Sequence, residues 1–279
     1  MIELLWFGAA SFAALLAVAG LLHAIGRFMP GLAKWCCAAP GLDLLVFSIA
    51  HGPWIAAGIV ASRLPDGAHW AAFLGTAIAS QVAAILVWGW LHEAATPGSR
   101  QGPRIVNSLN KRVGKWRNHA AVWWTALAVP LFTAIRIAEF IVYPPLTWIV
   151  RLPKYRMSEW VMVSRQKFSG LVGHDLIWCL YCDWMTGVWS LGSEMLRNVE
   201  SFWCPIRFSS TAKCDNCKVD FPDIEGGWVP HSLQGGTMAD VAATIEKQYP
   251  GPNGVNAWFG HPVRMTVSAS KKSNEDRTP

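Results

Sequence analysis

The stretch LLWFGAASFAALLAVAGLL, Leu4 to Leu22, contains no charged residue. A membrane-spanning helix needs about 20 predominantly apolar residues, because the hydrocarbon core of a bilayer is about 30 Å thick. Two later stretches, Leu44–Ser62 and Trp70–Leu91, also lack charged residues and reach this length. The sequence therefore predicts three membrane-spanning helices within its first third.

The composition of the whole chain agrees with a lipid environment. Of the 279 residues, 15% are charged and 52% are hydrophobic, and 17 residues are tryptophan. An average soluble domain carries about 25% charged residues, so much of this chain must contact something other than water. We expect a mainly α-helical, polytopic membrane protein whose partner is the lipid bilayer, with other membrane proteins as candidate partners.

The positions of the basic residues predict the orientation of the helices. Arg27 and Lys34 follow the first span, and six further cations follow the third. These six are Arg100, Arg104, Lys111, Arg112, Lys115 and Arg117. Because cytoplasmic loops carry an excess of Lys and Arg, we expect the N-terminus outside and both basic loops in the cytoplasm. Topology is the favoured explanation of the net charge of +6, with recognition of nucleic acid or anionic lipid as the weaker alternative, and we expect no binding of nucleic acid.

The fourth apolar region, residues 120–150, is interrupted by proline. Pro130 divides it, and Pro144-Pro145 lies near its end. A simple crossing would place the next five cations outside, namely Arg151, Lys154, Arg156, Arg165 and Lys167. We therefore expect a kinked, partly interfacial segment and a C-terminal half that stays in the cytoplasm. The predicted location is the inner membrane of a bacterium.

Two charged residues lie inside this fourth region. Arg136 and Glu139 are one helical turn apart, so they can pair on one face of a helix. Ionisable residues at membrane depth indicate either a path for ions and protons or a structural ion pair. Because a single pair is not a relay chain, we favour a structural intramembrane ion pair and keep transport as a weaker alternative.

Five of the seven cysteines lie between residues 179 and 217. They form two Cys-x2-Cys pairs and one single residue; the pairs are Cys179 with Cys182 and Cys214 with Cys217, and the single residue is Cys204. Two such pairs have the ligand spacing of a four-thiolate metal site. Cys36 and Cys37 are adjacent, and we interpret them as packing residues or acylation sites.

The first pair lies within the stretch WCLYCDW. If Asp175–Phe202 is read as a helix, its apolar side chains form one continuous stripe, and Cys179 and Cys182 lie on the opposite, polar face. Filling of an apolar core is therefore the poorer explanation for these two thiols. Gly187 and Gly192 weaken the helix, so a break near them is an alternative.

The second pair lies in the polar stretch Lys213–Lys218, which resembles the knuckle of zinc ribbons and rubredoxin-like sites over six residues. We expect zinc held by four thiolates, since zinc needs only reduced thiols and can stiffen a domain with a small core. The predicted ligands are Cys179, Cys182, Cys214 and Cys217. An iron–sulfur cluster with Cys204 as an alternative ligand is the second interpretation. A thioredoxin-like thiol–disulfide site fits less well, because no recognisable strand precedes Cys179. Structural disulfides or thiols that bind no metal are the remaining alternatives.

These observations divide the chain into three parts. The predicted parts are a transmembrane region over 1–150, with spans at about 4–22, 44–62, 70–91 and the kinked segment 120–150; a cysteine-rich metal-binding domain over 151–270; and a disordered tail over 271–279. Within the second part, Thr237 and Asp240 predict a capping box and a helix to Gln248. Val263–Ser268 alternates like a strand.

Motifs for enzymatic chemistry are missing from the sequence. It contains no nucleotide-binding loop, nucleophile elbow or paired catalytic carboxylates, so no catalytic residue is assigned. We expect an integral membrane protein that uses a cysteine-ligated zinc site as a structural, assembly or regulatory module. The alternative from another class is a membrane redox protein that transfers electrons through an iron–sulfur cluster.

Overall fold

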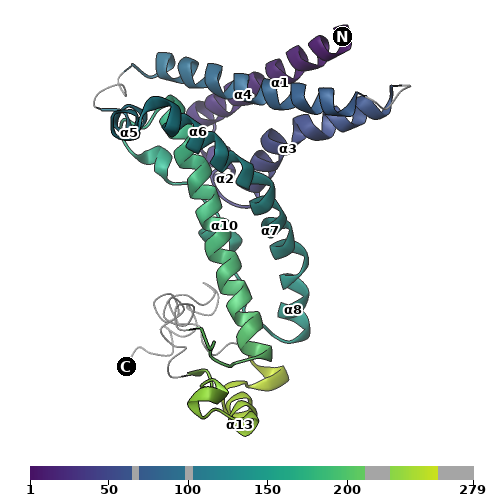
Figure 1. Ribbon diagram of the computed structural model, residues 1–279, viewed down its shortest axis with the longest axis vertical. Helices are drawn as coiled ribbons and strands as arrows, with labels where there is room; N and C mark the ends of the chain where they lie inside the picture. Colours follow the sequence, from purple (N-terminus) through teal and green to yellow (C-terminus); the bar gives the residue numbers. More distant parts are fainter. Residues whose placement is uncertain (65–68, 98–102, 211–226, 257–279) are drawn as a thin grey trace. The chain divides into compact units, whose positions relative to one another are not determined.

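The computed structural model describes residues 1–64, 69–97, 103–210 and 227–256, and its regular structure there is helical (Figure 1). Within these ranges the only strand-like pairings are two isolated bridges, Ala38 with Met162 and Ile206 with Val229. The predicted strand at 263–268 and tail at 271–279 lie outside the described residues. The prediction of a mainly α-helical chain is confirmed.

Four helical stretches are long and apolar enough to cross a membrane. Three are single helices: α1 (Ile2–Phe28), α3 (Gly41–Ser62) and α4 (Trp70–Ala95). Each contains one of the three predicted spans and extends beyond it. The short helix α2 (Pro30–Cys36) lies between α1 and α3 in the sequence. By length and composition, these stretches suggest an integral membrane protein with several spans.

The fourth stretch, Lys115–Ile149, is not one regular helix. It consists of α6 (Lys115–Thr125), the 3₁₀ turn η2 (Ala126–Ala128), α7 (Val129–Ile141) and α8 (Tyr143–Ile149). Proline explains where two of these helices begin, because in the first turn its missing N–H costs no helical hydrogen bond. Pro130 and Pro144 are each the second residue of a helix. The predicted interruptions are present, and the interfacial position of this stretch stays a prediction.

Helix α10 (Gly173–Trp203) is continuous over 31 residues. The alternative of a break near Gly187 or Gly192 is therefore wrong. A Cβ atom at Gly192 would lie 3.0 Å from Oε1 of Glu139 and 3.4 Å from Ile135, both on α7. Close approach of a neighbouring helix, rather than a change of direction, accounts for this glycine.

The remaining described elements are short. They are α5 (Ile105–Val113), α9 (Met157–Trp160), α13 (Met238–Gln248), η3 (Arg165–Lys167), η4 (Ser232–Gln234) and η5 (Gly251–Asn253). The capping box of α13 is confirmed, since the N–H of Thr237 donates to Oδ2 of Asp240 at 2.9 Å and the N–H of Asp240 donates to Oγ1 of Thr237 at 3.3 Å. The helix ends at Gln248, as predicted.

The chain forms two compact units. The first contains Met1–Thr133 and Val161–Gly187, and the second contains Ala134–Trp160 and Val188–Pro279. The first half of α10 thus belongs to one unit and its second half to the other. Each unit combines residues from both sides of position 150.

In the first unit, α3 and α4 pack through small side chains. Ala57, Ala61 and Ala77 are buried together with Phe73. Small residues let helix backbones approach closely, which favours packing even where lipid removes the hydrophobic driving force. The side chain of Gln81 adds a polar link, because it donates to two carbonyl oxygens of α3 at 2.8 Å each.

In the second unit, the apolar stripe of α10 is buried beside polar side chains. Val188, Leu191 and Met195 belong to the predicted stripe and are buried. Asn198 is 2% exposed, and its amide donates to the hydroxyl of Tyr155 and to a backbone carbonyl one turn earlier. Buried amides are costly unless hydrogen-bonded, so these bonds allow Asn198 to lie in the core.

Candidate thiol site on helix α10

The first cysteine pair lies in the half of α10 that belongs to the first unit. Cys179 is half-buried and Cys182 is exposed, and neither is part of a disulfide. In an α-helix, residues three apart lie on the same face one turn apart. The pair therefore presents two free thiols on one face of a regular helix.

A basic side chain lies beside these thiols. Arg165, from the turn η3, has a raised pKa chiefly because its guanidinium hydrogen-bonds Cys182. Its Nε atom also lies 3.5 Å from Oδ1 of Asp183. A cation near sulfur favours the thiolate over the thiol, and the charge of Arg165 acts in this direction on the pKa of Cys179.

Asp183 fixes the backbone that carries Arg165. Its Oδ2 atom accepts the backbone N–H of Ser164 at 2.6 Å and that of Arg165 at 3.1 Å. Asp183 follows Cys182 directly in α10, so a single carboxylate holds the basic turn against the cysteine face. The sequence contains no signal for this contact, because a loop and a helix 18 residues apart meet only in three dimensions.

Burial opposes the effect of Arg165 at Cys179. Burial raises the pKa of this thiol, and the nearby Arg165 lowers it, with a raised pKa as the net result. Near neutral pH, Cys179 therefore favours the thiol until a metal ion or another electrophile replaces the proton.

The segment that carries Arg165 also contacts the adjacent cysteines Cys36 and Cys37, through Cys37. The N–H of Val163 donates to the carbonyl of Cys37 at 2.8 Å, and Nε2 of Gln166 lies 3.5 Å from its sulfur. Burial, followed by the neighbouring Cys36, raises the pKa of the Cys37 thiol. Residues 161–167 thus touch both cysteine pairs of the first unit.

Of the other predicted ligands, Cys204 alone lies among the described residues. Cys214 and Cys217 lie outside the described residues. Cys204 is exposed and follows the last residue of α10. Among the described residues, no group of three or more His, Cys, Asp or Glu side chains is placed to hold a metal ion. The four-thiolate site and its metal therefore stay predictions.

The predicted ion pair of Arg136 and Glu139 lies on α7, in the second unit. Nη1 of Arg136 is 2.5 Å from Oε2 of Glu139, and both side chains are 4% exposed. The guanidinium carbon of Arg136 also lies 4.3 Å from the centre of the Phe140 ring. These contacts fix both charges within one helix turn, as a structural pair requires. The membrane depth of the pair stays a prediction.

Histidines gather where α10 begins, in the first unit. Nδ1 of His92 accepts the N–H of Gly173 at 3.2 Å, and Nε2 of His174 accepts Nε1–H of Trp178 at 3.1 Å. The ring of His174 also lies 5.5 Å from that of His119. The imidazole of His92 thus links α4 to α10, and that of His174 accepts a hydrogen bond within α10, a grouping that sequence spacing could not reveal.

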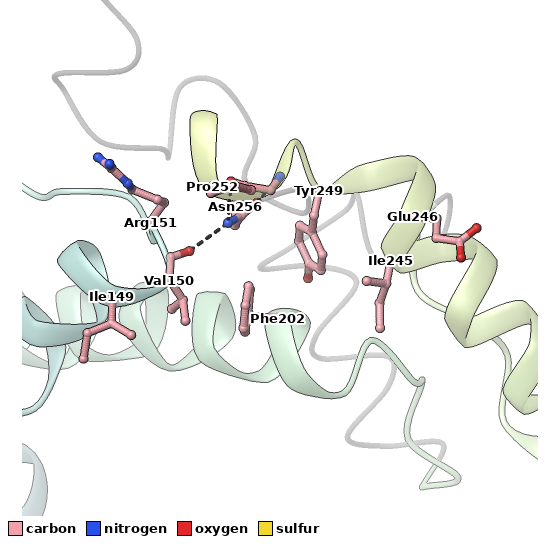
Figure 2. Close-up of a pocket in the computed structure, with 10 residues that line it drawn as sticks. Ile149, Val150, Arg151, Phe202, Ile245, Glu246, Tyr249, Pro252 and Asn256 are labelled. Atoms are coloured by element: carbon pink, nitrogen blue, oxygen red, sulfur yellow. Dashed lines mark hydrogen bonds between the residues drawn. The ribbon is translucent and has the colours of Figure 1, made fainter.

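A hollow of about 530 Å³ lies in the second unit, between the end of α8 and α13 (Figure 2). Its wall is largely apolar, with Phe202 and Tyr249 near its centre, whereas the side chains of Arg151 and Glu246 point away from them. A ligand site normally adds a few converging polar groups to an apolar wall. The hollow lacks this arrangement among its described lining residues, so the thiol pair is the stronger candidate site.

No family model, no curated protein and no solved structure matches this chain.

Proposed function

We propose that this chain is a multi-span membrane protein whose Cys179 and Cys182 supply half of a zinc site, with Cys214 and Cys217 as the other half. In this proposal the site serves as a structural, assembly or regulatory module in a reducing compartment. The supporting observation is the pair of free thiols one turn apart on α10, beside the guanidinium of Arg165.

The charges at the pair suit a thiolate site. Zn²⁺ with four thiolates has a net charge of about −2, which a nearby cation stabilises. Arg165 supplies one such charge, and Asp183 holds its backbone in place. Because the pKa of Cys179 is raised, zinc must displace a proton there, so the affinity for zinc increases as the pH rises toward that pKa.

Metal analysis of the purified full-length protein tests this proposal. We expect one equivalent of zinc in the wild type and loss of zinc when Cys179 and Cys182 are both replaced by serine. The matched control is Cys36→Ser, which removes another half-buried thiol of the first unit and should leave zinc bound. A chelator should lower the melting temperature of the wild type and not that of the double variant.

Two outcomes would overturn the zinc proposal. A brown preparation with iron and acid-labile sulfide would replace it with the redox alternative, especially if Cys204→Ser also removed the colour. A colourless, metal-free preparation in which all seven cysteines react with a thiol reagent would remove both metal interpretations.

A further inference from the structure

Helix α5 (Ile105–Val113) carries an apolar stripe that the described residues leave about half exposed. Ile105, Leu109 and Val113 are spaced four residues apart, so they lie along one face of the helix. They are 49%, 43% and 48% exposed. In water such a stripe is unfavourable, so its exposure indicates a partner other than the described residues.

Hydrogen bonds attach α5 to α10 and to α6. At its start, the carboxylate of Asp175 accepts the N–H of Ile105 at 2.9 Å and that of Val106 at 3.1 Å. Further along, the amide of Asn118 on α6 donates to the side chain of Asn110 at 2.9 Å. These bonds fix the rotation of α5 about its axis and leave the stripe facing outward.

Positive charge surrounds this stripe. Four exposed cations lie on α5 and at the start of α6, namely Lys111, Arg112, Lys115 and Arg117. None of the four takes part in an ion pair within the described ranges, whereas Arg104 pairs with Glu93 at 3.7 Å. The sequence has no Asp or Glu between Glu93 and Glu139, so no acid within this stretch of the sequence neutralises them. The exposed Trp116 lies among them.

The surface also lies next to a candidate span. Gly114, with φ of 92°, links α5 directly to Lys115, where the fourth apolar stretch begins. A short basic helix with an apolar stripe, attached to a span, is suited to the boundary between lipid headgroups and acyl chains. Tryptophan is also favoured at this boundary.

We propose that α5 and the first turn of α6 bind the headgroups of anionic phospholipids, with Ile105, Leu109 and Val113 inserted among the upper acyl chains. A nucleic acid fits this surface less well, since it would leave the apolar stripe exposed. The lipid surface is independent of the thiol pair and goes beyond the proposed zinc function. Each cation near an anionic surface strengthens binding by about fivefold, so four of them favour anionic over neutral lipid strongly.

Hydrogen exchange of the full-length protein in lipid nanodiscs tests the proposal. One set of discs contains phosphatidylcholine alone, and the other an equal mixture of phosphatidylcholine and phosphatidylglycerol. We expect the amides of residues 105–113 to exchange at least about tenfold more slowly in the anionic discs, with the difference reduced by high salt. Replacing the four cations by glutamine should abolish the difference, whereas Leu109→Asn should speed exchange in both kinds of disc.

Lys247→Gln is the matched control, because it removes an exposed cation from α13 in the second unit. This variant should behave like the wild type at residues 105–113. Equal exchange of the wild type in neutral and anionic discs would overturn the proposal. So would binding of a DNA duplex by the detergent-solubilised protein that competes with phosphatidylglycerol and is lost in the four-cation variant.

Discussion

At the scale of single residues, the ion pair on α7 allows a direct test of its contribution to stability. Removing one partner of a buried pair leaves the other charge without compensation, which costs about 3–5 kcal/mol. We therefore expect Arg136→Met to lower the free energy of unfolding by this amount. Denaturant titration of the purified protein in micelles measures the change.

An exposed pair of the same spacing serves as the control. Arg156 and Glu159 lie 3.3 Å apart with side chains 50% and 43% exposed, so Arg156→Met should cost at most about 1 kcal/mol. Combining Arg136→Met with Glu139→Leu should restore most of the stability, because neither charge is then buried alone. A double variant as unstable as the single one would mean that other contacts of these side chains matter more than their pairing.

Residue contacts were predictable where they are local in the sequence. The capping box of Thr237 and Asp240 follows from a spacing of three residues, and the pair of Arg136 and Glu139 follows from one helical turn. The contact of Asp183 with Arg165 was not predictable, since it depends on how a loop returns to a helix. The sequence located one cysteine pair of the candidate site and missed the cation beside it.

At the scale of elements, Asp175 connects the start of α10 to the start of α5. Burial alone would raise the pKa of this carboxyl, but the nearby His174 side chain and the hydrogen bonds from the N–H groups of Val106 and Ile105 outweigh it and lower the pKa below its ordinary value of 3.8. The ionised carboxylate therefore stabilises α5 above about pH 4, and this stability is lost as the pH falls through the depressed pKa.

We expect Asp175→Asn to weaken α5 by about 0.5–2 kcal/mol near neutral pH, because the cap loses its charge and one acceptor. Hydrogen exchange of residues 105–113 should become faster in this variant and no longer depend on acid pH. Asp240→Asn, which changes the cap of α13, should instead affect only residues 238–248. Unchanged exchange of α5 in Asp175→Asn would show that the cap does not form in solution.

The helices of the apolar region were predictable from composition, because a long stretch without charged residues is enough to predict a spanning helix. Helix α5 was not predicted, since the cations near it were interpreted as an orientation signal and its nine residues as part of a loop. The continuity of α10 also needed the structure, which shows that Gly192 lies against Glu139 and Ile135 of α7 rather than at a break.

At the scale of the whole molecule, the main prediction is that the N-terminus lies outside the membrane and the C-terminus lies in the cytoplasm. Arg151, Lys154 and Arg156 follow the fourth stretch, and cations are disfavoured on the outer side. We expect alkaline phosphatase fused to the C-terminus to be inactive in bacterial cells and a green fluorescent fusion at the same point to fluoresce.

A phosphatase fusion after Arg63 is the control, because the connection between α3 and α4 is predicted to lie outside and should give an active enzyme. An active C-terminal phosphatase would mean four full crossings, as the length of Lys115–Ile149 permits. The cysteines after that stretch would then face an oxidising compartment, where disulfides replace zinc thiolates.

The segment between Val161 and Arg165 is held at both ends by hydrogen bonds of its backbone. Ala39 donates to the carbonyl of Val161 at 2.9 Å, and Asp183 accepts the N–H of Arg165 at 3.1 Å. The side chain of Met162, by contrast, is 38% exposed. Over evolutionary time, substitutions at position 162 should be tolerated far more readily than an insertion or deletion in this segment, because any change in length would shift one set of bonds out of register.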